Sequence, residues 1–229
     1  MKNDPEMLFR YERKFVTTLL TFQQMERQVL INPGLFSEIY SPRHINNIYF
    51  DSHNLRSYFG NVDGSMIRVK ARIRWYGDLF GRVESPVLEF KIKCGIMGKK
   101  ESFKGSSFIF DDSIDLYKIH DAVGLDQLPD SLREIFTPLK PVMVNRYRRK
   151  YFLSADKQCR ITIDHQQSFR KIHSHSNSFF ANAIQSGRIV LEVKYNYSHS
   201  EQIDQITGCF PIRMMKNSKY VAGMDYLYG

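Results

Sequence analysis

Charged and apolar residues alternate along the segment 67–75. Side chains of a β-strand point alternately to opposite faces, so this pattern predicts a strand with one cationic and one apolar face. The cations are Arg68, Lys70, Arg72 and Arg74. Half-buried antiparallel strands often turn polar residues to water, but four like charges in a row repel one another. We therefore expect an anionic ligand along this face, with a solvated edge as the alternative.

The same alternation returns in four other segments of the chain. Their charged positions are Arg10, Glu12 and Lys14, then Glu89, Lys91 and Lys93, then Arg160 and Asp164, and finally Glu192 and Lys194. A sheet that closes into a barrel turns one face of every strand inward and leaves no free edge. The recurrence favours such a sheet, with a wet, cationic interior that holds a few carboxylates.

Hydrophobic periodicity and turn residues divide the chain into the elements of an α+β protein. Strands are predicted at residues 8–16, 43–51, 67–75, 87–94, 102–104, 142–154, 158–164 and 188–197. Helices are predicted at residues 17–30, 52–58, 200–207 and 216–224, and in broken pieces between residues 111 and 136. Residues 81–86 and 166–187 are predicted loops. No linker divides the chain, so residues 1–229 are expected to form a single domain.

Composition narrows the class of partner. The 229 residues are 42% hydrophobic and 14% aromatic and carry a net charge of +9, which favours an anionic partner such as a nucleotide, polyphosphate, nucleic acid or acidic membrane. Nucleic acid is disfavoured, because the aromatic residues mostly occupy the strand face opposite the cations. No apolar run approaches the roughly 20 residues of a transmembrane helix, and the first residues lack a signal sequence, so a cytoplasmic location is expected.

Residues that bind metals through sulfur or imidazole are sparse. Cys94, Cys159 and Cys209 are far apart and odd in number, which favours reduced thiols over a disulfide framework. Their spacing fits no structural zinc site. His173 and His175 stand in a polar stretch that reads as a solvated loop rather than as a metal site.

Eight short motifs follow one another in a recognisable order. They are Tyr11–Phe15, Asn47–Asp51, Ala71–Gly77, Leu88–Lys91, Tyr147–Tyr151, Arg160–Asp164, Leu191–Lys194 and Ser218–Gly223. Each motif is short, but their joint order resembles the VTC domain, over about residues 8–225. That domain is the polyphosphate polymerase branch of the CYTH-like triphosphate tunnel metalloenzyme superfamily.

The resemblance implies a fold and an activity. The implied fold is an antiparallel eight-stranded β-tunnel, a closed barrel with helices packed outside and a C-terminal helix near one mouth. The implied activity binds ATP and polyphosphate in the tunnel and transfers the terminal phosphate of ATP to a growing polyphosphate chain, with Mn²⁺ or Mg²⁺. A tunnel triphosphatase and a non-catalytic module for polyphosphate or inositol phosphates are the alternatives. Whether a separate membrane protein takes part is left open.

The resemblance also implies roles for individual residues. The implied phosphate-binding residues are Lys14, Arg72, Arg74, Lys91, Lys93, Arg149, Arg160, Lys194 and Lys219. The implied catalytic residues are Arg72, Arg74, Lys91, Arg149, Arg160 and Glu192. Glu192 matches the glutamate that the family uses for metal and is the expected leading ligand. Charge neutralisation beside phosphate adds Glu12 and Glu89 as candidate helpers, with the alternative that these glutamates only balance neighbouring lysines. Which of Arg146, Arg148 and Arg149 faces the tunnel is open.

These residue types suit phosphoryl transfer. Arginine grips phosphate oxygens in pairs, and lysine supplies a mobile point charge. The reaction needs in-line positioning and neutralisation of charge more than covalent help from the protein. A carboxylate beside phosphate would repel it, but a divalent metal held between the two reverses that repulsion. The mixture of cations and glutamates therefore indicates a metal-dependent triphosphate site.

Overall fold

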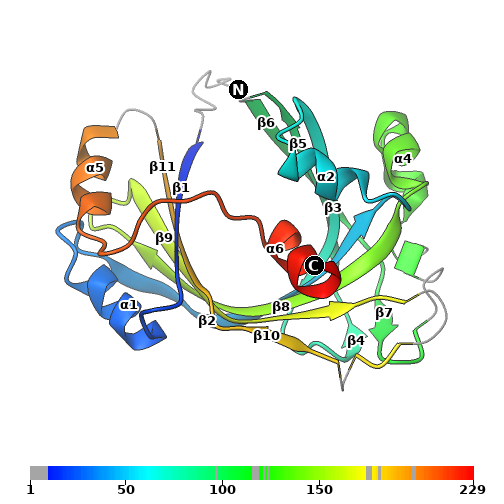
Figure 1. Cartoon of the computed structure of the whole chain (residues 1–229), viewed down its shortest axis with the longest axis horizontal. Helices are drawn as coiled ribbons and strands as arrows, with labels where there is room; N and C mark the ends of the chain where they lie inside the picture. Colours follow the sequence, from blue (N-terminus) through cyan, green and yellow to red (C-terminus); the bar gives the residue numbers. More distant parts are fainter. Residues whose placement is uncertain are drawn as a thin grey trace, which may run out of the picture. The chain divides into compact units, whose positions relative to one another are not determined.

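A computed structural model describes residues 10–95, 97–114, 119–120, 122, 124–173, 177–179, 182–196 and 200–229 (Figure 1). One sheet follows the strand order β1-β11-β9-β8-β2-β3-β5-β6, with β10 beside β9, and β4 pairs with β7 separately. The strands are β1 (Arg10–Thr17), β2 (Ser37–Asp51), β3 (Ile67–Tyr76), β4 (Gly81–Val83), β5 (Val87–Cys94), β6 (Met97–Lys104), β7 (Phe108–Phe110), β8 (Lys140–Leu153), β9 (Cys159–Lys171), β10 (Ile184–Ser186) and β11 (Ile189–Asn196).

Helices join and flank these strands. They are α1 (Phe22–Leu30), α2 (Arg56–Val62), the 3-10 turn η1 (Leu125–Gln127), α4 (Asp130–Phe136), α5 (Ser200–Gly208) and α6 (Lys219–Tyr228). The chain forms two compact units built from interleaved segments. Unit 1 comprises Met1–Arg43, Tyr147–Gln167 and Gly187–Asn217, and unit 2 comprises His44–Arg146, Ser168–Ser186 and Ser218–Gly229. The single-domain organisation stays a prediction.

Unit 1 has its own apolar core. Phe15 of β1, Ile161 of β9 and Leu191 of β11 are buried there, and the buried faces of α1 and α5 join them. Helix α1 starts five residues later than predicted, because Thr21 and Gln24 form a reciprocal capping box at its beginning.

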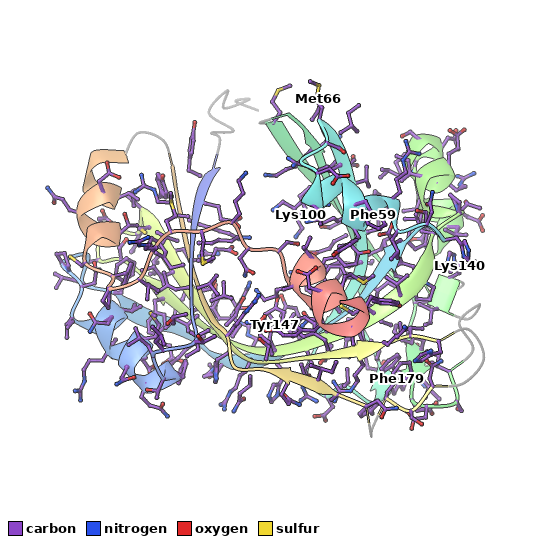
Figure 2. All side chains as sticks on the ribbon, in the orientation of Figure 1. Phe59, Met66, Lys100, Lys140, Tyr147 and Phe179 are labelled. Atoms are coloured by element: carbon purple, nitrogen blue, oxygen red, sulfur yellow. The ribbon has the colours of Figure 1, made fainter. Side chains whose placement is uncertain are left out.

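Unit 2 buries the apolar face of the cationic strand, as the alternation predicts. Ala71, Ile73 and Trp75 of β3 pack with Phe90 of β5 and with Phe179, which is labelled in Figure 2. Because β3 alternates, burial of these side chains leaves the cations on the other face. The core therefore fixes which way the charged row points.

Helix α6 is held tightly within unit 2. Its Tyr220 ring stacks on Tyr49 with centroids 5.3 Å apart, and its hydroxyl donates a hydrogen bond to buried Asp51. A Cβ at Gly223 would lie only 2.2 Å from the sulfur of Met143, so the helix approaches this closely only with glycine. The helix begins at Lys219, three residues later than predicted, because Ser218 is its N-cap.

Several predicted boundaries were wrong. Strand β9 continues to Lys171 although residues 166–171 were expected to be a loop. These polar residues can be buried because they are hydrogen-bonded: Gln167 donates to the carbonyl of Arg188, and the Ser168 carbonyl accepts from Asn145.

The remaining differences also favour strand over loop or helix. Strand β2 begins at residue 37 rather than 43, and β6 at residue 97 rather than 102. Two short strands, β4 and β10, lie in segments expected to be loops. In the segment 111–136, Asp111 accepts the backbone N–H of Ser113 in a turn instead of beginning a helix. His175 lies outside the described residues, and His173 is exposed.

The series from β1 to β6 contains the eight strands of the expected sheet. Every strand pair whose register is determined is antiparallel. Closure of the series into a barrel stays a prediction. None of the helices in the described part of the chain is both long and apolar enough to cross a bilayer.

Candidate phosphate and metal site

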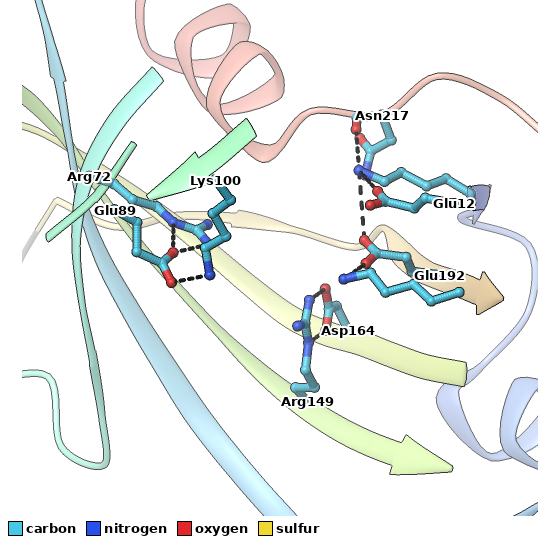
Figure 3. Close-up of polar contacts among 10 residues, drawn as sticks. Glu12, Arg72, Glu89, Lys100, Arg149, Asp164, Glu192 and Asn217 are labelled. Atoms are coloured by element: carbon cyan, nitrogen blue, oxygen red, sulfur yellow. Dashed lines mark hydrogen bonds and ion pairs between the residues drawn. The ribbon is translucent and has the colours of Figure 1, made fainter. Parts of the chain in front are cut away.

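Two arginines of the cationic row of β3 contact one buried carboxylate in unit 2. The Nε and Nη2 atoms of Arg72 donate to Oε2 of Glu89 at 2.9 and 2.7 Å, and Nη2 of Arg74 lies 2.9 Å from Oε1. Lys100 of β6 reaches the same Oε1 at 2.5 Å (Figure 3). We call these four residues the arginine cluster. Three cations on one carboxylate leave an excess of positive charge.

Glu89 is ionised under all ordinary conditions. Burial of its side chain, which is 3% exposed, would raise its pKa, but Arg72, Lys100 and Arg74 outweigh that effect and lower the pKa to about 2. Both carboxylate oxygens are engaged by cations, which is the balancing role that the sequence left open as the alternative to metal binding. Glu89 therefore holds the guanidinium groups of Arg72 and Arg74 in place.

The cationic face of unit 2 extends beyond this cluster. In the antiparallel register Lys70 lies opposite Lys91, and Arg68 lies opposite Lys93. The Nζ atom of Lys70 donates to the hydroxyl of Ser218 at 2.9 Å. Lys219 follows as the first residue of α6. Unit 2 thus contains five of the predicted phosphate-binding residues, namely Arg72, Arg74, Lys91, Lys93 and Lys219.

Unit 1 contains a second cluster with a different charge balance. In the register of β1 and β11, Glu12 lies opposite Lys194, and Lys14 lies opposite Glu192. Lys14 Nζ is 2.6 Å from Glu12 Oε1 and 3.7 Å from Glu192 Oε2, and Lys194 Nζ is 2.6 Å from Glu192 Oε1 (Figure 3). We call these four residues the carboxylate cluster. Its two lysines and two glutamates cancel in charge.

The carboxylates dominate the environment of Lys14. Burial by itself would lower the pKa of Lys14, but the negative charges of Glu192 and Glu12 outweigh it, so the pKa is raised above 10.5. Lys14 also donates a hydrogen bond to the backbone carbonyl of Asn217 at 3.1 Å. The ammonium therefore stays charged and is held among oxygen atoms.

Among the arginines of the long strand β8, Arg149 is the one near the carboxylate cluster of unit 1. Its Nε and Nη2 atoms contact the two oxygens of fully buried Asp164 at 2.5 and 2.7 Å. Burial would lower the pKa of Arg149, but Asp164 raises it well above the usual value. Strand alternation puts Arg146 and Arg148 on the opposite side of β8.

Arg160 lies on the same strand face as the carboxylate cluster. It pairs with Lys194 in the register of β9 and β11, and it is exposed. Unit 1 thus holds the other predicted site residues, namely Glu12, Lys14, Arg149, Arg160, Glu192 and Lys194.

Four participants were not assigned to the site from the sequence. The alternation contained Asp164, but nothing in it paired this residue with Arg149. Lys100 stood in a predicted flexible connection, and Tyr49, whose hydroxyl accepts from Arg72 at 3.2 Å, was noted only as strand bulk. The carbonyl of Asn217 leaves no signal in a sequence, because every residue has one.

The donor set of the carboxylate cluster suits a hard divalent cation. Among the residues that the structure describes, no group of three His, Cys, Asp or Glu side chains could hold a metal ion alone. Mg²⁺ is commonly held by one or two carboxylates together with phosphate oxygens and water. Glu12 and Glu192 meet that requirement. They come from adjacent strands, and both carboxylates lie within 4 Å of the Lys14 Nζ atom.

The fold of the chain is similar to that of several solved structures. Solved structures similar to it include HpAC1 from Hippeastrum, described as a putative adenylyl cyclase with a dominant triphosphatase activity (12% identity, TM-score 0.53, covering 95% of this chain and 96% of that one). A putative adenylate cyclase from Vibrio parahaemolyticus is 9% identical (TM-score 0.51, 93% and 96%). The PH1819 protein from Pyrococcus horikoshii is 11% identical (TM-score 0.51, 96% and 99%).

At these identities the solved structures support the fold alone. A search of curated proteins returned no match. The profile of the VTC domain, by contrast, matches residues 9–228, which is nearly the whole chain. The chain therefore belongs to the VTC domain family.

Proposed function

We propose that this protein binds ATP through its cationic face and transfers the terminal phosphate to a growing polyphosphate chain in a reaction that requires Mn²⁺ or Mg²⁺. Membership of the VTC family suggests the reaction. The structural observation that carries the proposal is the excess of cations around Glu89, where two arginines and a lysine gather on one carboxylate. Phosphate oxygens are the natural further partners of such a group.

The residues take complementary roles in this proposal. Arg72 and Arg74, whose guanidinium groups are oriented by Glu89, bind phosphate oxygens and neutralise charge on the transferred group. Lys91, Lys93 and Lys219 extend the phosphate-binding surface of unit 2.

In unit 1, Arg149, Arg160 and Lys194 supply further cations for phosphate. Glu12 and Glu192 hold the metal, which when bound supplies Lewis-acid neutralisation of phosphate oxygens. The acceptor is a phosphate oxygen, so no nucleophile from the protein is needed.

A triphosphatase is the second candidate. The similar HpAC1 protein is described as having a dominant triphosphatase activity, and hydrolysis needs the same charge neutralisation with water as acceptor. A module that only binds polyphosphate is the third candidate, because it would need the cations of unit 2 but not the carboxylate cluster.

One assay separates these candidates. Purified protein is incubated with ATP and Mn²⁺, and the products are resolved by size. Long anionic polymers support the polymerase, free phosphate alone supports the triphosphatase, and binding without turnover supports the module. The double variant Arg72→Ala/Arg74→Ala should lose ATP binding. The matched control Arg82→Ala, which removes an exposed arginine paired with Glu84 in the same unit, should retain it.

A further inference from the structure

Lys14 occupies a small cage of oxygen atoms in unit 1. Three oxygens from three separate segments surround its Nζ atom: Glu12 Oε1 at 2.6 Å, the Asn217 carbonyl at 3.1 Å and Glu192 Oε2 at 3.7 Å (Figure 3). Two of the three are carboxylate oxygens, so the cage carries negative charge. This geometry is that of a cation site in which the cation belongs to the protein itself.

A divalent metal would use the same oxygen atoms. Carboxylate and backbone carbonyl oxygens are the ligands that hard cations prefer, and an ammonium group competes for them through its charge and its three N–H donors. A metal ion and an ammonium group cannot share these oxygens at short range, because like charges repel strongly where water is limited. The cage therefore holds either the ammonium group of Lys14 or a metal ion, but not both.

We propose that Lys14 is an internal competitor that weakens metal binding to Glu12 and Glu192 and so sets the metal concentration at which the site fills. This inference rests on the proposed function only in taking those two glutamates as metal ligands. It goes beyond that function in assigning Lys14 a regulatory role at the metal site, besides its predicted contact with phosphate.

The side chain of Lys14 can leave the cage while its backbone stays in place. The main chain of Lys14 is fixed by its register with Glu192 and by the backbone N–H of Met215, which donates to the Lys14 carbonyl at 2.9 Å. The side chain is 23% exposed, so water can reach it. Once displaced, the ammonium keeps its charge and becomes available to a phosphate oxygen.

Lys194 provides a matched control on the same carboxylate. It contacts the other oxygen of Glu192 at 2.6 Å and is 41% exposed, so it lies outside the cage and is better screened by solvent. Removing either lysine deletes one positive charge near Glu192. Only removal of Lys14 also vacates the oxygen cage.

The test is titration of the full chain with Mn²⁺ in the absence of nucleotide, followed by calorimetry and by the electron paramagnetic resonance of free Mn²⁺. Lys14→Met should bind Mn²⁺ at least about tenfold more tightly than the unaltered protein, because a competing unit charge has been removed at contact distance. Lys194→Met should gain less than about threefold because that lysine is exposed. Adding Glu12→Gln to Lys14→Met should abolish the gain.

Two further variants keep the test decisive. Lys14→Gln, which is shorter and neutral, should reproduce the gain if Lys14→Met folds poorly. Lys14→Arg, which retains the charge, should bind Mn²⁺ no more tightly than the unaltered protein. Unchanged or weaker Mn²⁺ binding in both neutral variants would overturn the proposal, since Lys14 would then only position the carboxylates. Equal gains in the Lys14 and Lys194 variants would overturn it too.

The outcome is separable from that of the proposed function. If the unaltered protein makes polyphosphate with Mn²⁺ while the neutral variants bind Mn²⁺ no better, the competition fails and the function stands. If the neutral variants gain Mn²⁺ affinity while no transfer from ATP occurs, the competition stands and the function fails.

Discussion

Glu89 and Glu192 are both buried glutamates on strands of alternating pattern, yet their surroundings differ. Glu89 contacts three cations, of which two are arginines, and leaves two positive charges in excess. Glu192 contacts two lysines, and one of them, Lys14, also contacts a second glutamate, so the two lysines and two glutamates of its cluster cancel in charge. In the proposed function the first arrangement attracts an anion, and in the proposed competition the second exchanges Lys14 for a metal cation. The ratio of charges, rather than the presence of charge, is thus what distinguishes the proposed phosphate-binding surface from the proposed metal site.

The largest expected effect is the loss of Mn²⁺ binding and of turnover when Glu192, but not Glu89, is neutralised. Glu192→Gln removes the charge of the proposed leading metal ligand while keeping the shape of its side chain. We expect Mn²⁺ binding to be lost and metal-dependent turnover of ATP to fall by about a thousandfold or more, because metal stabilisation of phosphoryl transfer is worth several kcal/mol. Turnover is measured by product release with ATP and Mn²⁺, and Mn²⁺ binding by calorimetry.

Glu89→Gln is the matched comparison for that experiment. It alters a glutamate of similar burial that contacts only cations, so Mn²⁺ affinity should be unchanged. Circular dichroism of both variants checks that the fold is retained. Unimpaired metal-dependent turnover in Glu192→Gln, or loss of Mn²⁺ binding in Glu89→Gln, would show that the two clusters were assigned the wrong way round.

The next effect is a difference in stability between variants at Asp164 and at Glu89, because these buried carboxylates have different numbers of cationic partners. Asp164 is fully buried, and Arg149 is its bidentate partner. Arg149→Met should lower the free energy of unfolding by about 3–5 kcal/mol, because it leaves a buried charge without that partner. Arg72→Met should cost only about 1–2 kcal/mol, because Arg74 and Lys100 still neutralise Glu89.

Urea denaturation of both arginine variants measures this difference. Replacing Asp164 as well, in Arg149→Met/Asp164→Leu, should recover much of the lost stability because no charge is then left buried. Equal costs for the two single variants would mean that the extra cations around Glu89 contribute nothing to its stabilisation.

Acid should weaken the arginine cluster in a defined pH range. The pKa of Glu89 is lowered from 4.5 to about 2, so the unfolded chain takes up this proton first as the pH falls. The stabilisation is complete above about pH 4.5 and is lost as the pH approaches 2. A tenfold change in proton affinity corresponds to about 1.4 kcal/mol, so the loss is on the order of 3 kcal/mol.

The measurement is the free energy of unfolding from pH 6 to pH 2.5, compared with Glu89→Gln. The variant should lack this part of the acid dependence. The carboxylate cluster behaves oppositely through Lys14, whose pKa is raised above 10.5: its contribution is complete below pH 10.5 and is lost as the pH rises further. Parallel acid curves for the unaltered protein and Glu89→Gln would contradict the ion pairs around Glu89.

Much of the fold could be predicted from alternation alone. Strand β5 has the predicted bounds 87–94, and the cationic strand differs by one residue, because charges and apolar residues alternate there without interruption. Prediction failed where polar residues are buried by hydrogen bonds, as with Gln167 and Ser168 of β9. It also failed at the start of α1, where apolar Leu19 continued the helical spacing but is 91% exposed outside the helix.

The charged residues of the candidate site were visible in the sequence, but their pairings were not. Alternation identified Glu89 and Glu192 as members of charged faces, and it could not show that one contacts three cations and the other two. That outcome depends on the register between strands, since one-residue slips exchange every neighbour. Register is set by turns and core packing far from the charges, so it became visible only in the structure.

The smallest expected effect concerns the exposed lysine of each cluster. Lys100 is 52% exposed and Lys194 is 41% exposed, so each ion pair is screened by solvent and costs side-chain entropy to hold. Lys100→Ala and Lys194→Ala should each lower the free energy of unfolding by no more than about 0.5 kcal/mol. Their ligand effects should nevertheless differ in kind: Lys100→Ala should weaken ATP binding severalfold at low salt, whereas Lys194→Ala should slightly favour Mn²⁺ binding. Titrations at low and high salt measure both, because screening should reduce each difference. If Lys194→Ala weakened Mn²⁺ binding, the neutral cluster would not be a metal site limited by its own lysines.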